Sequence, residues 1–514
     1  LGNIPAQLTT YGLTLNNWQW QAWQDALTHR ARLVWGPPGT GKSRTVRAIA
    51  VGAVLEALES YRRLRVLVSA FTYTAIDNVL LEVGRDLAAL APRACDVFRV
   101  RSRYQATPGN IAPTIDLELN KAFPSPMVRA LRARLQRPNG VVVVGATSEQ
   151  VHNLLTTENG RATSEFFDLI LIDEASQMDV AHAILTIASI ANGGSVVLAG
   201  DPLQLSPIQQ AEAPKGLEDL VGSIYGFWKE RHQIPESPLS INYRSNDCIV
   251  GLARQSGYHA TLTSHSPALE LNLLAPIPTA QPAAWDARLF WTHEWADILN
   301  PARPAVCFVY GDGRSSQRND FEADAVASML LLLNGQMADQ LRNENHAGTG
   351  RPIPPTTTAY SATDFFRKAV GVVTPHRAQQ GLIVTRLLQV FGATGALAEA
   401  IRESVDTVER FQGQQRDIII ASYTLGDPDQ IAEEDEFLMS LNRFNVIASR
   451  ARAKLVVLVS EEVIGHLAHD IDVLRESRLL KYFAESFCGN VRPMLLGYHG
   501  SNGRVHVPGE FRWA

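Results

Sequence analysis

Eight consecutive positions of this sequence have the residue types needed to hold a phosphate chain. They run from Gly36 to Ser43 and read Gly-Pro-Pro-Gly-Thr-Gly-Lys-Ser. Glycines allow successive backbone N–H groups to turn toward an anion at the start of a helix. In this pattern the lysine reaches the β- and γ-phosphates and the final hydroxyl holds Mg²⁺. We therefore predict an ATP-binding loop made of Gly36, Pro37, Pro38, Gly39, Thr40, Gly41, Lys42 and Ser43.

The segments on both sides of this loop have the pattern that such a site needs. The apolar run from Leu33 to Trp35 predicts a buried strand, and the spacing of apolar residues from Ser43 to Ser60 predicts a helix. A glycine-rich turn with a chance lysine is the alternative. The placement between a strand and a helix argues against that alternative.

A second group of candidate catalytic residues follows later strands. The apolar run from Phe167 to Ile172 ends in Asp173 and Glu174. After a phosphate-binding loop, this arrangement predicts that Asp173 holds Mg²⁺ and that Glu174 orients and deprotonates the attacking water. Another strand, from Ser195 to Leu198, leads into a segment whose Gln204 could sense the γ-phosphate.

The elements that must position these residues predict an α/β fold. Buried strands are expected at 63–68 and 141–144, and a new parallel-sheet pattern follows at 306–310, 371–373, 417–422 and 454–460. Pro235 to Pro238 reads as a boundary. We predict a first domain at 1–235 with an inserted basic subdomain at 88–140, a second domain at 236–485 and a tail at 486–514.

Composition narrows the class of protein. The chain has 514 residues, 46% of them hydrophobic and 19% charged, with a net charge of −5, so any nucleic-acid surface must be local. Four cysteines without a C-x-x-C pair argue against zinc or iron–sulfur sites and fit a reducing compartment. No signal peptide or apolar run of membrane-spanning length appears, so we expect a cytoplasmic or nuclear protein. Because the chain begins with Leu1 rather than Met, we expect a trimmed sequence.

One segment is strongly basic. From Ala91 to Gly140, eight arginines and one lysine oppose three acids, which gives a net charge of +6. Contact with a phosphate backbone and a solvated helix face are both consistent with this excess.

Taken together, the motifs resemble those of superfamily 1 helicases, in the group of the nonsense-mediated-decay RNA helicase and its DNA-acting relatives. The resemblance runs in the family's order from Gln19 to Arg452. The matching segments are Leu15–Ala22, Gly36–Ser43, Ser69–Asn78, Asp173–Ser176, Gly200–Pro207, Asn242–Ser245, Val373–Gln379, Thr407–Asp417 and Arg443–Arg452.

The resemblance implies two tandem RecA-like domains with ATP between them, so that closure depends on the γ-phosphate. Gln19 would recognise adenine, Tyr243 would stack on it, and Gln415 would lie near the sugar. Arg244 and Arg450 would act as arginine fingers. Single-stranded DNA or RNA would be gripped by Phe71, Thr72, Thr147, Thr374 and Thr407.

The chain departs from the family pattern in several places. Phe71-Thr72-Tyr73 replaces the usual Pro-Ser-Asn, Gln415 replaces an acid, and Ser449 replaces a threonine. The residues before Leu15 leave no room for the family's accessory β-barrel, so we expect it either upstream of Leu1 or absent. Because Gln415 keeps an acceptor but loses the charge of the usual acid, we infer no preference between DNA and RNA from it.

Three functions agree with these observations. The first is an ATP-dependent helicase or translocase that moves 5′-to-3′ on a single strand. The second is a nucleic-acid-stimulated ATPase that remodels protein–nucleic-acid complexes. The third is an ATP-gated scaffold module within a larger repair, RNA-processing or defence assembly. Retention of Lys42, Asp173 and Glu174 argues against a dead ATPase.

Overall fold

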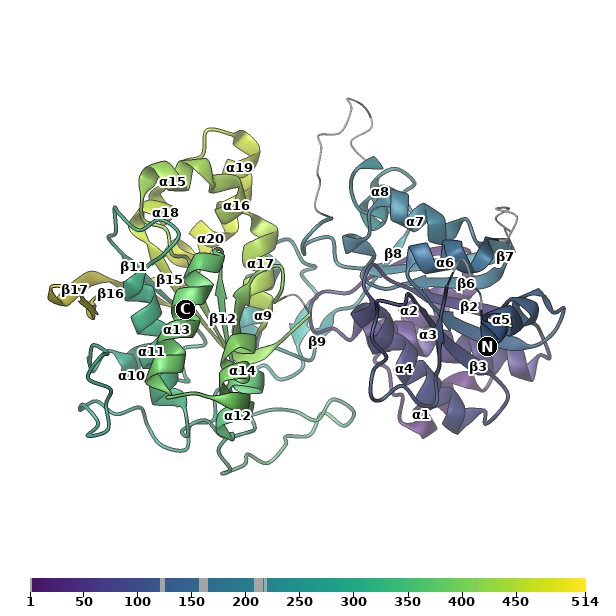
Figure 1. Ribbon diagram of the computed structural model, residues 1–514, viewed down its shortest axis with the longest axis horizontal. Helices are drawn as coiled ribbons and strands as arrows, with labels where there is room; N and C mark the ends of the chain where they lie inside the picture. Colours follow the sequence, from purple (N-terminus) through teal and green to yellow (C-terminus); the bar gives the residue numbers. More distant parts are fainter. Residues whose placement is uncertain (1, 121–124, 157–164, 208–215, 217–219, 412) are drawn as a thin grey trace. The chain divides into compact units, whose positions relative to one another are not determined.

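The computed structural model describes residues 2–120, 125–156, 165–207, 216, 220–411 and 413–514. The chain divides into two compact units, unit 1 (Leu1–Ile241) and unit 2 (Asn242–Ala514), coloured purple to teal and teal to yellow in Figure 1. The boundary predicted at residue 235 falls earlier than the observed one. The short strand β8 (Glu236–Pro238) pairs in parallel with β1 (Ala31–Trp35) and so belongs to the sheet of unit 1.

Unit 1 is built on one parallel sheet with the strand order β4-β3-β5-β2-β6-β7-β1-β8. Its remaining strands are β2 (Leu64–Ser69), β3 (Asp96–Arg101), β4 (Ile115–Glu118), β5 (Val141–Gly145), β6 (Phe167–Ile172) and β7 (Ile190–Gly200). Parallel strands place their carboxyl ends at one edge of the sheet, which is where ligands bind in open α/β folds.

Helices cover both faces of this sheet, as in Figure 1. Alternate residues of β2 show the arrangement: Val66 and Val68 pack on one face, and Leu67 packs on the other. The first face is covered by α1 (Ile4–Tyr11), α2 (Asn17–Thr28), α3 (Lys42–Glu59) and α4 (Tyr73–Leu90). The opposite face is covered by α5 (Pro126–Gln136), α6 (Ser148–Leu155), α7 (Val180–Ile187) and α8 (Ile224–Glu230).

Residues 88–140 do not stand apart from the sheet as an inserted subdomain. Strand β3 pairs in parallel with β5, and β4 pairs with β3, so both extend the sheet at its edge. Helix α5 buries Val128, Leu131 and Leu135 in the core of the second face. The segment is thus part of the three-layer fold, because its apolar residues alternate like those of the other strands.

Unit 2 is built on a seven-stranded mixed sheet with the order β13-β12-β14-β15-β11-β17-β16. The strands are β11 (Ala305–Tyr310), β12 (Val370–Thr374), β13 (Val405–Thr407), β14 (Arg416–Ser422), β15 (Ala451–Ser460), β16 (Asn490–Gly500) and β17 (Gly503–Trp513). Strand β17 runs antiparallel to β11 and β16, whereas the pairings among β11 to β15 are parallel. The segment at 486–514 is therefore a hairpin of the sheet and not a separate tail, and it buries Met494, Leu496 and Phe511.

Helices again lie on both faces of the unit 2 sheet. Alternate residues of β12 face opposite sides: Val372 packs in the main core, and Val373 faces Ile447. The longer helices are α9 (Asp247–Gln255), α11 (Asp320–Leu333), α13 (Arg377–Val390), α14 (Gly395–Ser404) and α17 (Leu441–Ser449). The shorter ones include α15 (Pro428–Glu433), α16 (Asp435–Leu438), α18 (Glu461–Gly465), α19 (Ile471–Glu476) and α20 (Arg478–Tyr482). Among the described residues, no helix is both long and apolar enough to cross a membrane.

A buried carboxyl group lies beside the carboxyl ends of β11 and β14. Glu322 on α11 is fully buried, and its Oε1 accepts a hydrogen bond of 2.6 Å from the Tyr310 hydroxyl. Its Oε2 accepts from the Ser422 hydroxyl and, at 2.9 Å, from the Thr424 N–H. Burial raises the pKa of Glu322 to about 7, and hydrogen bonds from Ser422 and Tyr310 offset only part of that rise.

This raised pKa predicts a pH-dependent stability cost. Glu322 ionises at a higher pH in the folded state than in the unfolded state, so its charge destabilises the fold increasingly as pH rises from about 4.5 toward about 7. Replacing it in Glu322→Gln removes this titration. Between pH 5 and pH 8 the free energy of unfolding of the variant, relative to wild type, should rise by about 2–3 kcal/mol. Urea unfolding of both proteins at pH 5 and pH 8 measures this change. A difference in the free energy of unfolding that is the same at both pH values would contradict the raised pKa of Glu322.

Candidate nucleotide-binding site

The phosphate-binding loop joins β1 to α3 and has the conformation that its glycines permit. Gly39 and Gly41 have φ values of +77° and +79°, in the left-handed region that favours glycine. Gly36 donates a hydrogen bond of 3.0 Å to the carbonyl of Gly200. A Cβ at Gly36 would lie 2.7 Å from the Cβ of Lys42, so no larger residue fits there without moving the lysine.

Two contacts connect this loop to the acids after β6. Lys42 Nζ lies 2.9 Å from Glu174 Oε2, and the Ser43 hydroxyl donates a 2.9 Å hydrogen bond to Asp173 Oδ2. Glu174 has a φ of +51°, which is strained backbone for a residue with a side chain. The structure therefore brings together the four residues predicted to act on the phosphates and the metal.

The electrostatics of these residues suit a divalent cation and a phosphate chain. Burial raises the pKa of Asp173 to about 6; the neighbouring Lys42 lowers it, and the Glu174 carboxylate raises it by a smaller amount. Burial lowers the pKa of Lys42, but Glu174 and Asp173 outweigh this effect and raise it overall. Mg²⁺ fits the oxygen donors of Ser43 and Asp173, because it binds few protein ligands and takes the rest from phosphates and water. In the described part of the chain, no group of three or more His, Cys, Asp or Glu residues could hold a metal by itself.

Gln19 lies against the same loop. It is 2% exposed, and its Nε2 donates a 3.1 Å hydrogen bond to the carbonyl of Thr40. Its Oε1 accepts from the N–H of Asn16, and the Asn16 side chain accepts from the N–H of Gln19, so the two residues form a capping box at the start of α2. Gln19 is thus buried beside the phosphate-binding loop and is not a surface glutamine. Recognition of adenine by this residue stays a prediction.

The predicted γ-phosphate sensor is held close to the acids. Gln204 Nε2 donates a 2.7 Å hydrogen bond to Asp201 Oδ2. The N–H of Asp201 donates to the hydroxyl of Ser176 at 3.1 Å, two residues after Glu174. Asp201 and Ser176 were not predicted as site residues, although both lie inside the motifs that carried the prediction.

In unit 2, residues from three separate motifs converge. Arg244 Nε donates to Gln415 Oε1 at 3.0 Å, and Arg244 Nη1 donates to the carbonyl of Ser449 at 2.8 Å. The adjacent Arg450 is 2% exposed, and its carbonyl accepts from the N–H of Arg416 at 3.0 Å. The Tyr243 ring lies 4.6 Å from that of His265. The predicted fingers Arg244 and Arg450 therefore share one corner of unit 2 with Gln415.

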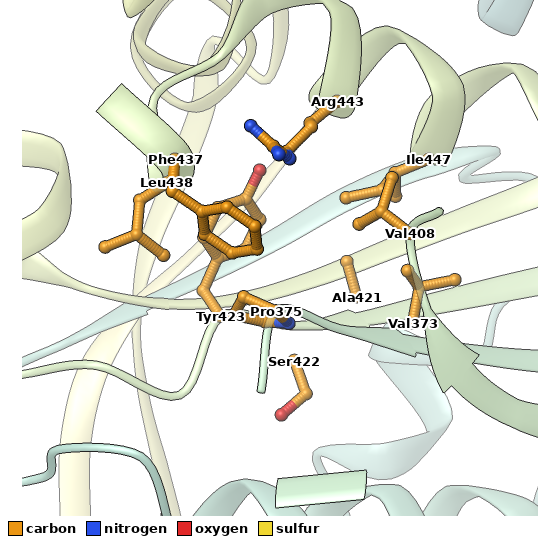
Figure 2. Close-up of a pocket in the computed structure, with 10 residues that line it drawn as sticks. All are labelled: Val373, Pro375, Val408, Ala421, Ser422, Tyr423, Phe437, Leu438, Arg443 and Ile447. Carbon is orange, nitrogen blue, oxygen red and sulfur yellow. The ribbon is translucent and has the colours of Figure 1, made fainter. Parts of the chain in front are cut away.

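Figure 2 shows a second point of convergence at the carboxyl ends of β12 and β14. Val373 and Pro375 come from one motif, Val408 from the next, and Arg443 and Ile447 from the last. The hollow that they line has a volume of about 20 Å³, enough for one water and too small for a ligand.

Arg443 connects two of the motifs around this hollow. Its guanidinium lies 4.0 Å from the centre of the Phe437 ring, and its Nε lies 3.1 Å from Glu409 Oε1. The motif at Thr407–Asp417 is thereby linked to helix α17, which precedes Arg450. Gln412 of that motif lies outside the described residues.

The residues predicted to grip a nucleic acid fall into two groups. Phe71 and Thr72 follow β2, and Thr147 follows the neighbouring strand β5, so these three lie at one edge of the unit 1 sheet. Phe71 is 49% exposed. In unit 2, by contrast, Thr374 is buried with its hydroxyl 3.1 Å from that of Thr424, and Thr407 is also buried. Contact of these two threonines with a strand stays a prediction.

Three arginines of the basic segment form ion pairs. Arg99 is fully buried and pairs with Asp77 at 2.6 Å and Asp116 at 3.0 Å. Arg101 pairs with Asp116 at 2.7 Å, and Arg134 pairs with Asp96. Asp96, Asp116 and Glu118 are already counted in the excess of +6, so only the pairing of Arg99 with Asp77, from α4, lowers it; Lys121 lies outside the described residues. Counting charges within residues 91–140 missed the ion pair of Arg99 with Asp77, because Asp77 lies in α4, outside that segment.

The loop, the paired acids and the parallel sheet with helices on both faces define unit 1 as a P-loop NTPase of the RecA-like class. Two family models, each described as an AAA domain, match residues 19–210 and 223–462.

Comparison with characterised proteins identifies similar sequences. MOV-10 of Gallus gallus is 25% identical over 509 residues, covering 90% of this chain and 46% of that protein. The DNA replication ATP-dependent helicase/nuclease DNA2 of Saccharomyces cerevisiae is 24% identical, covering 84% of this chain and 25% of that protein. The RNA helicase Mov10l1 of Mus musculus is 24% identical, covering 84% of this chain and 32% of that protein. The chain thus spans less than half the length of these relatives.

The motifs occur in the order of the family, and the relatives align with most of this chain. The chain therefore belongs to the superfamily 1 helicases, in the group of the nonsense-mediated-decay RNA helicase. This confirms the family that the ordered motifs indicated.

The close approach at Gly36 gives a direct test of the site. In Gly36→Ala the new methyl group would displace Lys42, and overpacking of this kind costs about 1–3 kcal/mol. We expect ATP to bind roughly 5- to 150-fold more weakly, measured by titration with a fluorescent ATP analogue.

The matched control for this variant is Gly381→Ala. Gly381 lies in α13, and a Cβ there meets no atom within 4 Å. Its substitution should leave nucleotide affinity unchanged. Equal affinity for both variants would show that Lys42 is not held by the close approach at Gly36.

Proposed function

We propose that this chain is the ATP-hydrolysing motor of a nucleic-acid helicase or translocase that moves 5′-to-3′ on single-stranded DNA or RNA. One observation carries the proposal: within unit 1, Lys42 and Ser43 already contact Glu174 and Asp173. This arrangement supports hydrolysis, whereas a scaffold module would not need the two acids beside the loop.

The contacts suggest how the site changes when ATP enters. Lys42 pairs with Glu174 at 2.9 Å, and phosphate oxygens would compete with the carboxylate for the same ammonium group. Release of Glu174 would leave its carboxylate available to orient and deprotonate the attacking water. Ser43 and Asp173 would hold Mg²⁺, which neutralises charge on the phosphates. Gln204, held by Asp201, would sense the γ-phosphate.

The residues of unit 2 would complete the reaction. We propose that Arg244 and Arg450 stabilise negative charge on the transferring phosphoryl group, which planar and permanently charged guanidinium groups do well. Tyr243 and Gln415 would contact the base and sugar of the nucleotide, together with Gln19 of unit 1. The shared corner of Arg244, Gln415 and Arg450 supports this assignment.

The proposed partner is a single strand, held mainly through its phosphates by Phe71, Thr72, Thr147, Thr374 and Thr407. Such contacts position the strand without reading its sequence. We further propose that the protein acts in the cytoplasm or nucleus, within a larger repair, RNA-processing or defence assembly.

Steady-state ATP hydrolysis without nucleic acid, with single-stranded DNA and with single-stranded RNA tests the motor. Salt must be constant, because binding to phosphates is strongly salt-dependent. We expect stimulation by at least one strand type, and Glu174→Gln should lower the stimulated rate by about 10²–10⁴-fold. The control Glu399→Gln changes an exposed glutamate of α14 and should leave the rate unchanged. Basal turnover that no strand stimulates would contradict the motor.

The role of Arg450 can be tested separately. Arg450→Ala should lower the maximal hydrolysis rate by about 10³-fold or more, because a finger acts on the transition state. Since Arg450 is buried, Arg450→Lys is needed as a second variant that keeps the charge but loses the planar fork. Arg475→Ala, at an exposed ion pair of α19, is the control and should turn over like wild type. A wild-type rate for the folded Arg450 variants would exclude the finger.

A further inference from the structure

One exposed tyrosine lies at the functional edge of the unit 1 sheet, outside every motif of the family. Tyr104 follows β3 by three residues and is 82% exposed. The guanidinium of Arg103 lies 4.5 Å from the centre of its ring and also donates a hydrogen bond to its hydroxyl. The two side chains thus form a preassembled cation–π pair that faces solvent.

The position of this pair is set by the strand order. Strand β5 lies between β2 and β3, and all three are parallel, so the carboxyl end of β3 is two strands from that of β2. At about 4.8 Å per strand, this separation is roughly 10 Å. Phe71 follows β2, Thr147 follows β5, and Arg103 and Tyr104 follow β3 along the same edge.

The end of β3 is held rigidly against the start of α4. The N–H of Ser102 donates a 3.1 Å hydrogen bond to the hydroxyl of Tyr73, and Arg99 lies 5.4 Å from the centre of the same ring. Arg99 also makes two hydrogen bonds to Asp77 of α4, at 2.6 and 2.9 Å. Tyr73 is one of the residues that departs from the family pattern, so this connection is a feature of the present chain.

The carboxylates near the Arg103–Tyr104 pair are matched by other arginines, which leaves the Arg103 guanidinium available to contact a phosphate. The carboxylates nearest to the end of β3 in sequence and pairing are Asp77, Asp116 and Glu118, and each is matched by Arg99 or Arg101. In the part of the chain that the structure describes, Arg103 has no carboxylate partner within ion-pair distance. The pair therefore combines a π-face with an unneutralised guanidinium, the two groups that bind one nucleotide of a single strand.

We propose that Arg103 and Tyr104 form a nucleotide-binding subsite for single-stranded DNA or RNA, in which Tyr104 stacks on a base and Arg103 contacts an adjacent phosphate. The subsite extends the path of the strand from Phe71 past Thr147 to β3. This inference rests on the proposed function, since it names a further contact for the same strand. The subsite accepts any base, because every base presents a π-face.

The test measures binding of a fluorescein-labelled oligothymidylate by fluorescence anisotropy at fixed salt. Tyr104→Ala should bind roughly 5- to 150-fold more weakly, the range for loss of one stacked base. Tyr104→Phe should bind like wild type, since it keeps the ring. Arg103→Ala should reduce the slope of log affinity against log salt by about 0.7, as expected for one phosphate of a single strand.

Two controls separate stacking from general effects. Tyr61→Ala removes a tyrosine that is 96% exposed but precedes β2, at the opposite edge of the sheet, and it should not change affinity. With an abasic oligonucleotide, wild type and Tyr104→Ala should bind equally, because no base remains to stack. An unchanged thermal unfolding midpoint shows that each variant is folded.

The possible outcomes distinguish this inference from the function on which it rests. Wild-type binding of oligothymidylate together with equally tight binding by Tyr104→Ala would overturn the subsite and leave the motor intact. A wild-type protein that binds no single strand, and whose ATP hydrolysis no strand stimulates, would overturn both. Weaker binding by Tyr61→Ala to the same extent as by Tyr104→Ala would also overturn the subsite, since the effect would not depend on the sheet edge.

Discussion

The ion pair between Lys42 and Glu174 is the interaction on which the arrangement of unit 1 depends. Lys42 is 8% exposed and Asp173 only 1%, so the charges of this site are largely removed from water and must compensate one another. That compensation requires the start of α3 and the end of β6 to be adjacent, which the parallel pairing of β6 and β1 with β7 provides. It also requires a loop without a side chain at Gly36, because a Cβ there would meet Lys42. The fold and the site therefore constrain each other.

The same sheet edge connects this chemistry to the proposed path of the strand. The strands β6, β2, β5 and β3 are neighbours in that order, so their carboxyl ends form one row along the sheet edge. The residues proposed for hydrolysis and for strand contact follow strands of this row. Buried ion pairs make this edge stiff: Arg99 connects β3 to Asp77 of α4, and α4 begins directly after Phe71 and Thr72.

Much of the site could be predicted from the sequence because its chemistry is local. The loop at Gly36–Ser43 and the acids after Phe167–Ile172 are contiguous motifs, and the structure places them in contact. Features that depend on tertiary pairing were not predicted. The excess of arginines at 91–140 suggested phosphate contact or a solvated helix face, but one of them, Arg99, is buried and pairs with Asp77, which lies outside that segment. The residues at 486–514 looked like a tail, yet pairing with β11 makes them strands, since their apolar residues face an existing core.

The charge balance of unit 1 bears on how a protein with a net charge of −5 can hold a polyanion. Arg99, Arg101 and Arg134 are engaged with Asp77, Asp96, Asp116 and Glu118, so these three guanidinium groups are not free to contact a phosphate chain. Under the proposed function, backbone N–H groups at the starts of α4 and α6 and exposed rings such as Phe71 would contribute to the affinity for a strand. Stacking and backbone contacts release fewer counterions than a basic groove does. In the proposed motor, stacking and backbone contacts of this kind would hold the strand at short range, alongside the contacts to its phosphates.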